Sequence, residues 1–142
     1  MSHFTDKELD YLGSQRLGRL ATINQKGQPQ ITPVGFHYNA ELDVIEIGGR
    51  YLSKTQKVRN IKKDPHVSFV IDDVAPPWQP RGVEIRGIAE VIADGGQNVF
   101  NFGGDYAVDP MFIRIKPTQI VGWGIEGEGY QANNRKVGQD RG

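Results

Sequence analysis

The feature that most limits the fold of this chain is a series of short apolar runs separated by turns rich in glycine, proline and asparagine. The runs either alternate apolar and polar residues or are rich in β-branched residues, which is typical of β-strands. They cover residues 16–23, 30–38, 42–47, 66–71, 82–93 and 111–121. Strands and helices do not alternate regularly, so a doubly wound sheet is not expected. The pattern predicts a mainly β protein with short helices, built as a small antiparallel barrel of six strands.

Two short helices are predicted from their capping signals. Thr5 and Glu8 have the spacing of a capping box at the start of the first helix. Ser53 and Gln56 repeat this spacing at the start of the second helix, with Ser53 as the N-cap. The second helix is expected to end before Pro65, because the residue that precedes a proline is disfavoured in the α conformation.

Proline and glycine predict the irregular parts of the chain. The segment Asp72–Pro80 is predicted to be a stiff proline loop, and Pro117 predicts a bulge or break in the last strand. The glycine-rich segment Asp94–Pro110 is predicted to be irregular, with one helical turn near Asn98–Phe102.

The length of 142 residues fits one folded domain. We expect residues 1–126 to form the barrel, and residues 127–142 to form a polar C-terminal tail that is flexible because it has few apolar side chains. The chain has no cysteine, which excludes disulfides and thiolate metal sites. No apolar run follows Met1 or approaches the length of a membrane span, so we expect a cytoplasmic protein.

The strongest functional signal is a basic segment directly after Gly48-Gly49. Six of the 17 Lys and Arg residues fall within residues 50–63, and this segment contains no acidic residue. The start of a helix there would present free backbone N–H groups and the positive end of the helix dipole. Lys54 and Lys57 are predicted on the inward side of the helix, where they either bind an anion or only extend along the edge of the core. The remaining bases are interpreted as a solvent-exposed face: Arg59, Lys62 and Lys63.

Other motifs predict no further site. The sequence Gly122–Gly127 matches G-x-G-x-x-G, but no βαβ unit surrounds it, so a dinucleotide fingerprint is rejected. Three scattered histidines predict no metal site, and the adjacent Asp72 and Asp73 would face apart and are not an acid–base pair. No catalytic residue is assigned. Seventeen acids balance 17 bases, so binding to nucleic acid or to an anionic membrane is not expected.

Trp78 and Trp123 are the only tryptophans, and both fall outside the periodic core pattern. One interpretation is that each closes a mouth of the barrel. The other is that they form a wall for a flat ligand or for a partner subunit, since tryptophan suits both roles.

The order of these pieces resembles the pyridoxamine 5'-phosphate oxidase-like family, and most closely its branch that uses the deazaflavin coenzyme F420. The resemblance runs from about Phe4 to Glu126 and includes RLGRLATI, GQPQITPVGF, VIEIGGR and SKTQKVRNIKKDPHVSFVIDD. Its most specific part couples A-T-x-x-x-x-G-x-P-x-x-x-P-V to S/T-x-K-x-R-N-I/L-x-x-D/N-P.

The resemblance implies an FMN-binding type of split β-barrel, assembled as a homodimer with the cofactor in a groove between subunits. It places the cofactor phosphate at Thr55 and Lys57, with Arg50 and Lys54 close enough to assist. The ring system is expected against the backbone of the second and third strands, where glycine lets a planar ligand approach closely. The residues implied there are Thr32, Pro33, Val34, Gly35, Gly48 and Gly49, with Trp78 and Trp123 from the second subunit.

These expectations give a leading hypothesis and two alternatives. The leading hypothesis is an oxidoreductase that passes hydride between reduced F420, or FMN, and a small conjugated acceptor, with the chemistry supplied by the cofactor. The first alternative is a non-catalytic flavin or haem carrier on the same barrel. The second is a nucleic-acid-binding barrel, which the neutral charge disfavours. The polar tail has no equivalent of the substrate-binding residues of pyridoxamine phosphate oxidases proper, so that substrate is not expected.

Overall fold

The computed structural model describes residues 1–126 and 132–138 of the chain. The helices are α1 (Asp6–Ser14), α2 (Gln56–Lys63) and α3 (Gly96–Val99), and a 3-10 turn, η1 (Leu52–Lys54), precedes α2. The strands are β1 (Leu17–Ile23), β2 (Pro29–Asn39), β3 (Val44–Gly48), β4 (His66–Ala75), β5 (Gln79–Ile92), β6 (Phe112–Trp123) and β7 (Asn133–Lys136). None of the helices in these two ranges is long and apolar enough to span a membrane.

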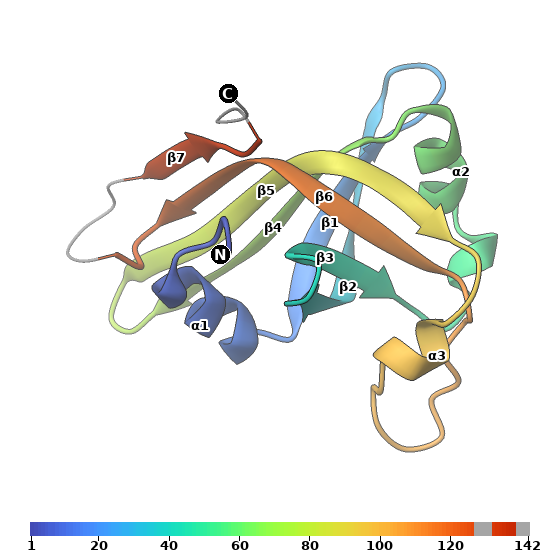
Figure 1. Cartoon of the computed structure of the whole chain (residues 1–142), viewed down its shortest axis with the longest axis horizontal. Coiled ribbons are helices and arrows are strands. Elements are labelled where there is room, and N and C mark those ends of the chain that lie inside the picture. Colours follow the sequence, from blue (N-terminus) through green and yellow to red (C-terminus); the bar gives the residue numbers. More distant parts are fainter. Residues whose placement is uncertain (127–131, 139–142) are drawn as a thin grey trace.

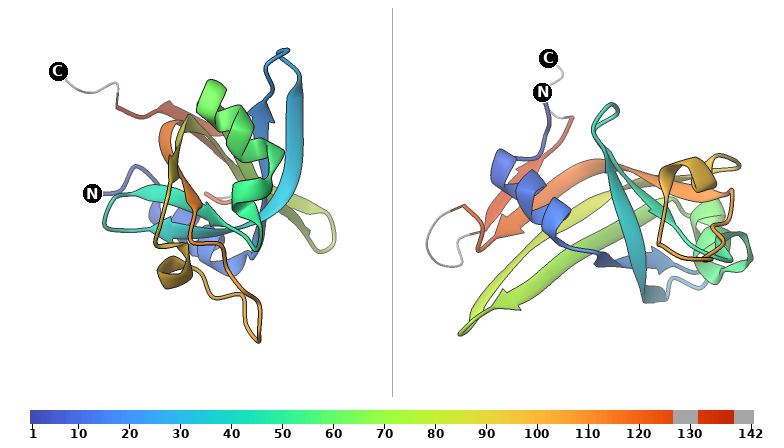
Figure 2. Two further views of the ribbon diagram at one scale, coloured as in Figure 1. Left: turned by 90° about the vertical axis from the view of Figure 1, so that its right-hand side faces the viewer. Right: turned by 90° about the horizontal axis from the view of Figure 1, so that it is seen from below.

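Strands β1 to β6 form a closed antiparallel barrel, which confirms the predicted fold class. Their order is β3-β2-β1-β4-β5-β6, and pairing of β3 with β6 closes the barrel. Strand β7 is added outside the barrel along β6 (Figure 1). Helices α1 and α2 lie at opposite ends of the barrel, and α2 packs against β1 and β5 (Figures 1 and 2).

The core follows from the period of two along each strand. Alternate residues point inward, and most of the largest fully buried side chains are aliphatic or aromatic strand residues. They include Leu20, Ile45, Ile47, Phe69, Ile71, Ile85, Ile113, Ile115 and Ile120. The expected irregularity at Pro117 is confirmed, because the β5–β6 register shifts between Arg86 and Gly87, opposite this proline.

The predicted proline loop at residues 72–80 is wrong. Strand β4 continues to Ala75 and β5 begins at Gln79, so the two strands form a long hairpin that projects from the barrel (Figure 2). The consecutive prolines Pro76 and Pro77 lie at its tip, where no ladder hydrogen bond is needed.

Part of the predicted polar tail also belongs to the fold, since Asn133–Lys136 forms β7. Its Arg135 hydrogen-bonds Glu8 of α1, with Nη1 to Oε2 at 3.1 Å, and also the carbonyl of His3. Glu8 is completely buried and forms the predicted capping box with Thr5. The tail is therefore held by a ladder and by an ion pair, and Val137 also packs against the core. Residues 127–131 and 139–142 lie outside the described part of the chain.

Candidate cofactor-binding site

The start of α2 carries no side-chain cap, although the sequence predicted one. The prediction of Ser53 as N-cap is wrong, because α2 begins at Gln56 and Thr55 is the preceding residue. The Thr55 hydroxyl donates to the carbonyl of Leu52 at 2.7 Å and makes no capping bond. No side chain of the described residues therefore accepts a hydrogen bond from the first N–H groups of α2, which lie at the positive end of the helix dipole.

Lys57 lies in the first turn of α2 and is half-buried. Burial lowers the pKa of its ammonium group, because a desolvated cation is less stable. Among the described residues, no carboxylate lies within ion-pair distance of this group. An uncapped helix start beside a partly desolvated, unpaired cation is suited to bind an anion.

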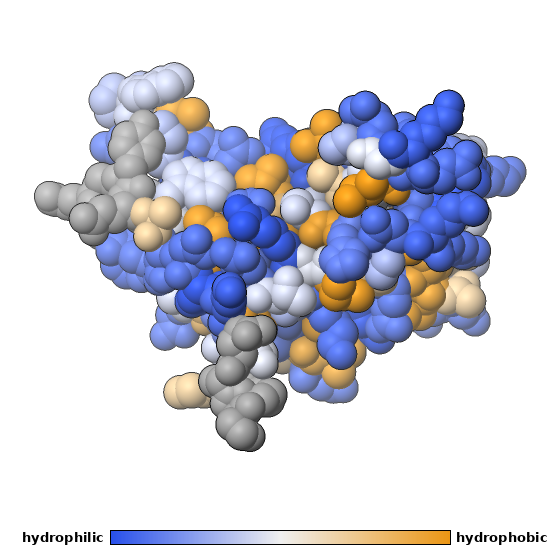
Figure 3. All heavy atoms as spheres, turned by 90° about the horizontal axis from the view of Figure 1, so that it is seen from above, coloured by the Kyte–Doolittle hydropathy of each residue, from blue (hydrophilic) through white to orange (hydrophobic). Residues whose placement is uncertain are grey.

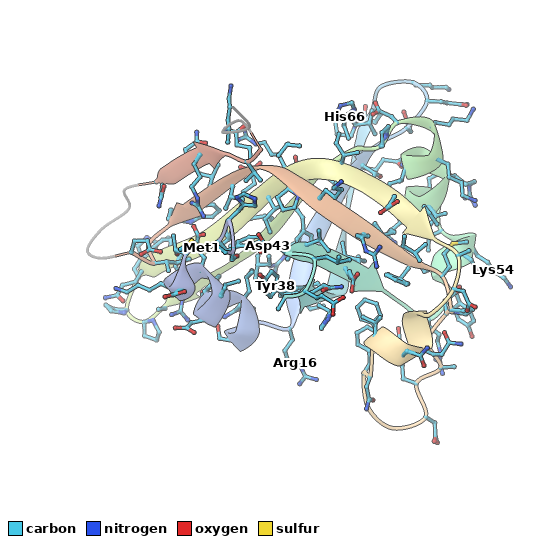
Figure 4. All side chains as sticks on the ribbon, viewed as in Figure 1. Met1, Arg16, Tyr38, Asp43, Lys54 and His66 are labelled. Atoms are coloured by element: carbon cyan, nitrogen blue, oxygen red, sulfur yellow. The ribbon has the colours of Figure 1, made fainter. Side chains whose placement is uncertain are left out.

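Lys54 does not share the inward helix face with Lys57, so that part of the prediction is wrong. It ends the η1 turn before α2, is exposed, and lies at the end of the barrel opposite Met1 (Figure 4). Its position next to Thr55 still allows it to assist an anion at the helix start.

A second basic surface lies on the other side of α2, and the sequence did not predict it. A groove of about 460 Å³ separates α2 from the turn between β1 and β2. Lys26, Arg59 and Lys63 line it, together with five uncharged polar residues: Asn24, Gln25, Gln30, Gln56 and Asn60. This end of the molecule is predominantly hydrophilic (Figure 3). Arg59 and Lys63 are therefore part of a cationic groove, not only of a solvated face.

Asn60 fixes the floor of this groove. Its buried amide donates to Thr22 Oγ1 at 2.9 Å and to Gln30 Oε1 at 2.8 Å, and accepts from Gln56 Nε2 at 2.8 Å. Gln56 in turn accepts from the Arg59 guanidinium at 2.9 Å. These bonds tie α2 to both strands of the β1–β2 hairpin and orient one of the cations.

Two of the glycines predicted to face a flat ligand contact the protein's own rings. Gly35 pairs with Gly48 across β2 and β3. A Cβ on Gly35 would lie 2.5 Å from Phe102, and a Cβ on Gly48 would lie 2.5 Å from Phe100. These rings stack with centroids 5.8 Å apart. On the side where a Cβ would point, Phe100 and Phe102 make the close planar approach that the glycines permit, and a role of Gly35 and Gly48 in cofactor binding stays a prediction.

Of the other residues predicted to contact the ring system, Gly49, Thr32 and Pro33 are more open and Val34 is not. A Cβ on Gly49 would have only Leu52 Cβ nearby, at 3.9 Å. Thr32 and Pro33 are exposed on β2, whereas Val34 is buried. The cofactor role of all these residues stays a prediction.

Arg50, which follows Gly49, is exposed, and its guanidinium lies within cation–π distance of two aromatic rings. It is 5.1 Å from the ring centroid of Tyr106 and 5.9 Å from that of Tyr51. Cation–π contacts of this kind hold the cation at the surface without consuming its hydrogen-bond donors.

The tryptophans do not lie beside α2 within one chain. Trp78 is 72% exposed at the tip of the β4–β5 hairpin, which is inconsistent with a buried plug. Trp123 ends β6 and lines an open groove of about 280 Å³ on the outside of the sheet, with Ala21, Ile31 and Val70 among its neighbours.

Comparison with known proteins agrees with this architecture. A family model described as pyridoxamine 5'-phosphate oxidase matches residues 4–124. A 5a,11a-dehydrotetracycline/5a,11a-dehydrooxytetracycline reductase from Streptomyces rimosus subsp. rimosus is 42% identical over 127 residues, which cover 88% of this chain and 86% of that protein.

Two solved structures also have a similar fold. A protein named F420 reductase has a TM-score of 0.56 and 27% identity, over 74% of this chain and 88% of its own. A haem-binding protein from Mycobacterium smegmatis has a TM-score of 0.66 and 17% identity, over 96% of this chain and 60% of its own.

Proposed function

Because the chain belongs to the pyridoxamine 5'-phosphate oxidase family, we propose that it is an oxidoreductase that uses reduced coenzyme F420, or alternatively FMN, to reduce a conjugated acceptor. The observation that carries this proposal is the uncapped start of α2 beside Lys57. Both cofactors contain a phosphate, and this arrangement supplies backbone donors and a cation for it. The bound cofactor supplies the hydride.

In this proposal, the protein's own residues bind the cofactor and orient its ring system. Thr55 and Lys57 hold the phosphate, with Lys54 and Arg50 nearby. The exposed residues Thr32 and Pro33 and the open side of Gly49 are the surfaces that we propose for the ring system. The name of the Streptomyces relative specifies dehydrotetracyclines, and we accordingly propose a flat, conjugated polycyclic acceptor.

The basic groove beside α2 favours F420 over FMN. F420 carries an acidic polyglutamyl tail beyond its phosphate, whereas FMN ends at the phosphate. Lys26, Arg59 and Lys63 offer three cations to such a tail, and no acidic side chain lines the groove within the described residues. We therefore propose that the tail lies along this groove.

We expect F420 to bind more tightly than FMN, with a stronger dependence on salt. Raising the ionic strength from about 0.1 M to about 1 M shortens the screening length from about 10 Å to about 3 Å and weakens attraction to an exposed tail. Fluorescence titrations of both cofactors across this range measure the effect. Arg59→Ala should reduce the salt dependence of F420 binding, and Lys62→Ala, on the same helix but outside the groove, should not. Equal affinities and equal salt dependences would favour an FMN protein.

An exposed apolar face supports the proposal of a homodimer. The outer surface of the sheet presents Leu17, Ile31 and Val74, and the tip of the β4–β5 hairpin presents Trp78. Ile31 also lines the groove beside Trp123, together with the charged residues Arg19 and Glu84. Exposed apolar surface of this kind is typical of an interface between proteins. A second copy is the occupant we propose, and it would bring Trp78 and Trp123 to the cofactor groove of its partner.

Light scattering at micromolar concentration is therefore expected to give the mass of a dimer. Ile31→Glu places a charge in the middle of the proposed interface and should shift the protein towards monomers. Leu42→Glu is the matched control, because Leu42 is also an exposed apolar residue but lies in the turn between β2 and β3. A monomeric wild-type protein would contradict the shared groove.

Titration followed by turnover tests the function as a whole. The protein is titrated with F420, FMN and haem, and the reduced form of the tighter flavin-type ligand is then mixed with a conjugated polycyclic ketone. The proposal predicts oxidation of the cofactor that depends on the acceptor. Tight binding without turnover would support a carrier instead, as the name of the haem-binding structural relative suggests; binding of none of the three would contradict both functions.

A further inference from the structure

Asp109 makes a cluster of hydrogen bonds that none of the sequence motifs predicts. Its carboxylate accepts from the backbone N–H of Ser53 at 3.0 Å, from Ser53 Oγ at 2.7 Å and from the N–H of Met111 at 3.0 Å. Its own backbone N–H donates to the carbonyl of Gly49 at 2.8 Å. Asp109 thus joins two segments that are 56 residues apart in the sequence.

These bonds fix the backbone that leads from β3 into α2. Gly49 lies at the start of this connection and Ser53 lies within the η1 turn, two residues before Thr55. Asp109 therefore holds both ends of the connection, through its backbone at Gly49 and its carboxylate at Ser53. Within the described part of the chain, its side chain makes no hydrogen bond or ion pair with Thr55 or Lys57. Burial would raise the pKa of Asp109, but hydrogen bonds from Ser53 and Met111, together with the positive charge of Lys54, outweigh burial and hold the pKa below its usual range.

The segment that carries Asp109 is itself anchored on the barrel. Phe100 is buried against Gly48, and Phe102 covers Gly35. Tyr106 packs edge-on against Phe102 at 5.1 Å between ring centroids and supports the guanidinium of Arg50. This packing holds the segment in place, so the Asp109 carboxylate can hold the connection between β3 and α2 in one position.

We propose that Asp109 is a positioning residue for the phosphate subsite at the start of α2. By holding Gly49 and Ser53, it sets the direction in which Thr55, Lys57 and the first N–H groups of α2 face the phosphate. Without its carboxylate, the η1 turn around Ser53 is released and gains conformational freedom that must be lost again when a phosphate binds, although the backbone bond to Gly49 remains. This inference rests on the proposed cofactor-binding function.

A comparison of FMN with riboflavin tests the role of Asp109, because the two ligands differ only in the phosphate. Dissociation constants are measured for the wild-type protein, Asp109→Ala, Ser53→Ala, the double variant, and Asp105→Ala. Asp105 is the matched control: it is an exposed aspartate on the same segment. Asp109→Ala is expected to weaken FMN binding about tenfold, equal to about 1.4 kcal/mol, and riboflavin binding less than about twofold.

The other variants show whether the effect passes through Ser53. Ser53→Ala removes the hydroxyl bond but keeps the backbone N–H bond, so it should weaken FMN binding about two- to threefold. The double variant should match Asp109→Ala, because the Ser53 hydroxyl has lost its partner already. Asp105→Ala should bind both ligands like the wild-type protein.

Each remaining outcome has a distinct meaning. Equal weakening of FMN and riboflavin by Asp109→Ala would overturn the positioning role and leave a purely structural one. Unchanged FMN binding would also overturn it. Wild-type protein that binds FMN no better than riboflavin would remove the phosphate subsite itself, and wild-type protein that binds neither FMN nor F420 would overturn the proposed function.

Discussion

Lys57→Ala is expected to weaken cofactor binding by about 10- to 150-fold. The substitution removes a hydrogen bond between an ammonium group and a phosphate, which contributes about 1.5–3 kcal/mol, and each 1.4 kcal/mol changes the dissociation constant about tenfold. Lys57 is half-buried and has no carboxylate partner among the described residues, so the loss is not offset elsewhere. Fluorescence titration with FMN and F420 measures it.

Lys62→Ala provides the control for this prediction. Lys62 is an exposed lysine on the same helix, it is absent from the basic groove, and its replacement should change the affinity less than about threefold, as for a surface charge. Both variants should fold, because the buried Val58 and Ile61 still anchor α2. Similar losses in the two variants would show that the lysines act only as a general positive field, and the phosphate site would have to be withdrawn.

Arg135→Ala is expected to lower the free energy of unfolding by about 2–3 kcal/mol, since it leaves the carboxylate of Glu8 buried without its cation. Glu8 is completely buried, and Arg135 also hydrogen-bonds the carbonyl of His3, so the variant loses two links between β7 and the N-terminal segment. Urea denaturation followed by tryptophan fluorescence measures the change.

Lys136→Ala is the matched control in β7. Lys136 is exposed and makes no ion pair with the described residues, so its replacement should change the free energy of unfolding by less than about 0.5 kcal/mol. If Arg135→Ala behaves like this control, the C-terminal strand does not contribute to the stability of the barrel.

Most of the barrel was predictable because its signals are local. The capping box of Thr5 and Glu8 depends on residues three apart, and it is present. The alternation of apolar residues predicted the strands, and Pro117 correctly marked the irregular register. The prolines at residues 72–80 led to the wrong prediction of a loop, because the sequence does not distinguish a stiff loop from a hairpin with prolines at its tip.

The parts that were missed depend on contacts between distant residues. Strand β7 has no apolar pattern, and its place depends on Arg135 meeting Glu8, 127 residues away. Ser53 is a residue type that favours the N-cap position, but its hydroxyl and its backbone N–H both donate to the Asp109 carboxylate instead. No local signal connects these residues.

The candidate site was predictable only in part for the same reason. The sequence indicated an anion site at the helix after Gly48-Gly49, and the structure adds its physical basis in the absence of a cap on α2. The sequence could not show that Lys26, from the turn between β1 and β2, lines the same groove as Arg59 and Lys63. Glycines at positions 35 and 48 indicated that a planar group lies close, but not that the group belongs to the protein.

The start of α2 is the proposed binding site of the cofactor phosphate. The most direct test is the backbone amide spectrum of ¹⁵N-labelled protein during titration with FMN and, separately, with riboflavin. The amides of Gln56, Lys57 and Val58, which have no side-chain acceptor in residues 1–126 and 132–138, should shift strongly with FMN and much less with riboflavin. Saturable FMN binding that leaves these three amides unchanged would place the phosphate elsewhere and contradict the claim.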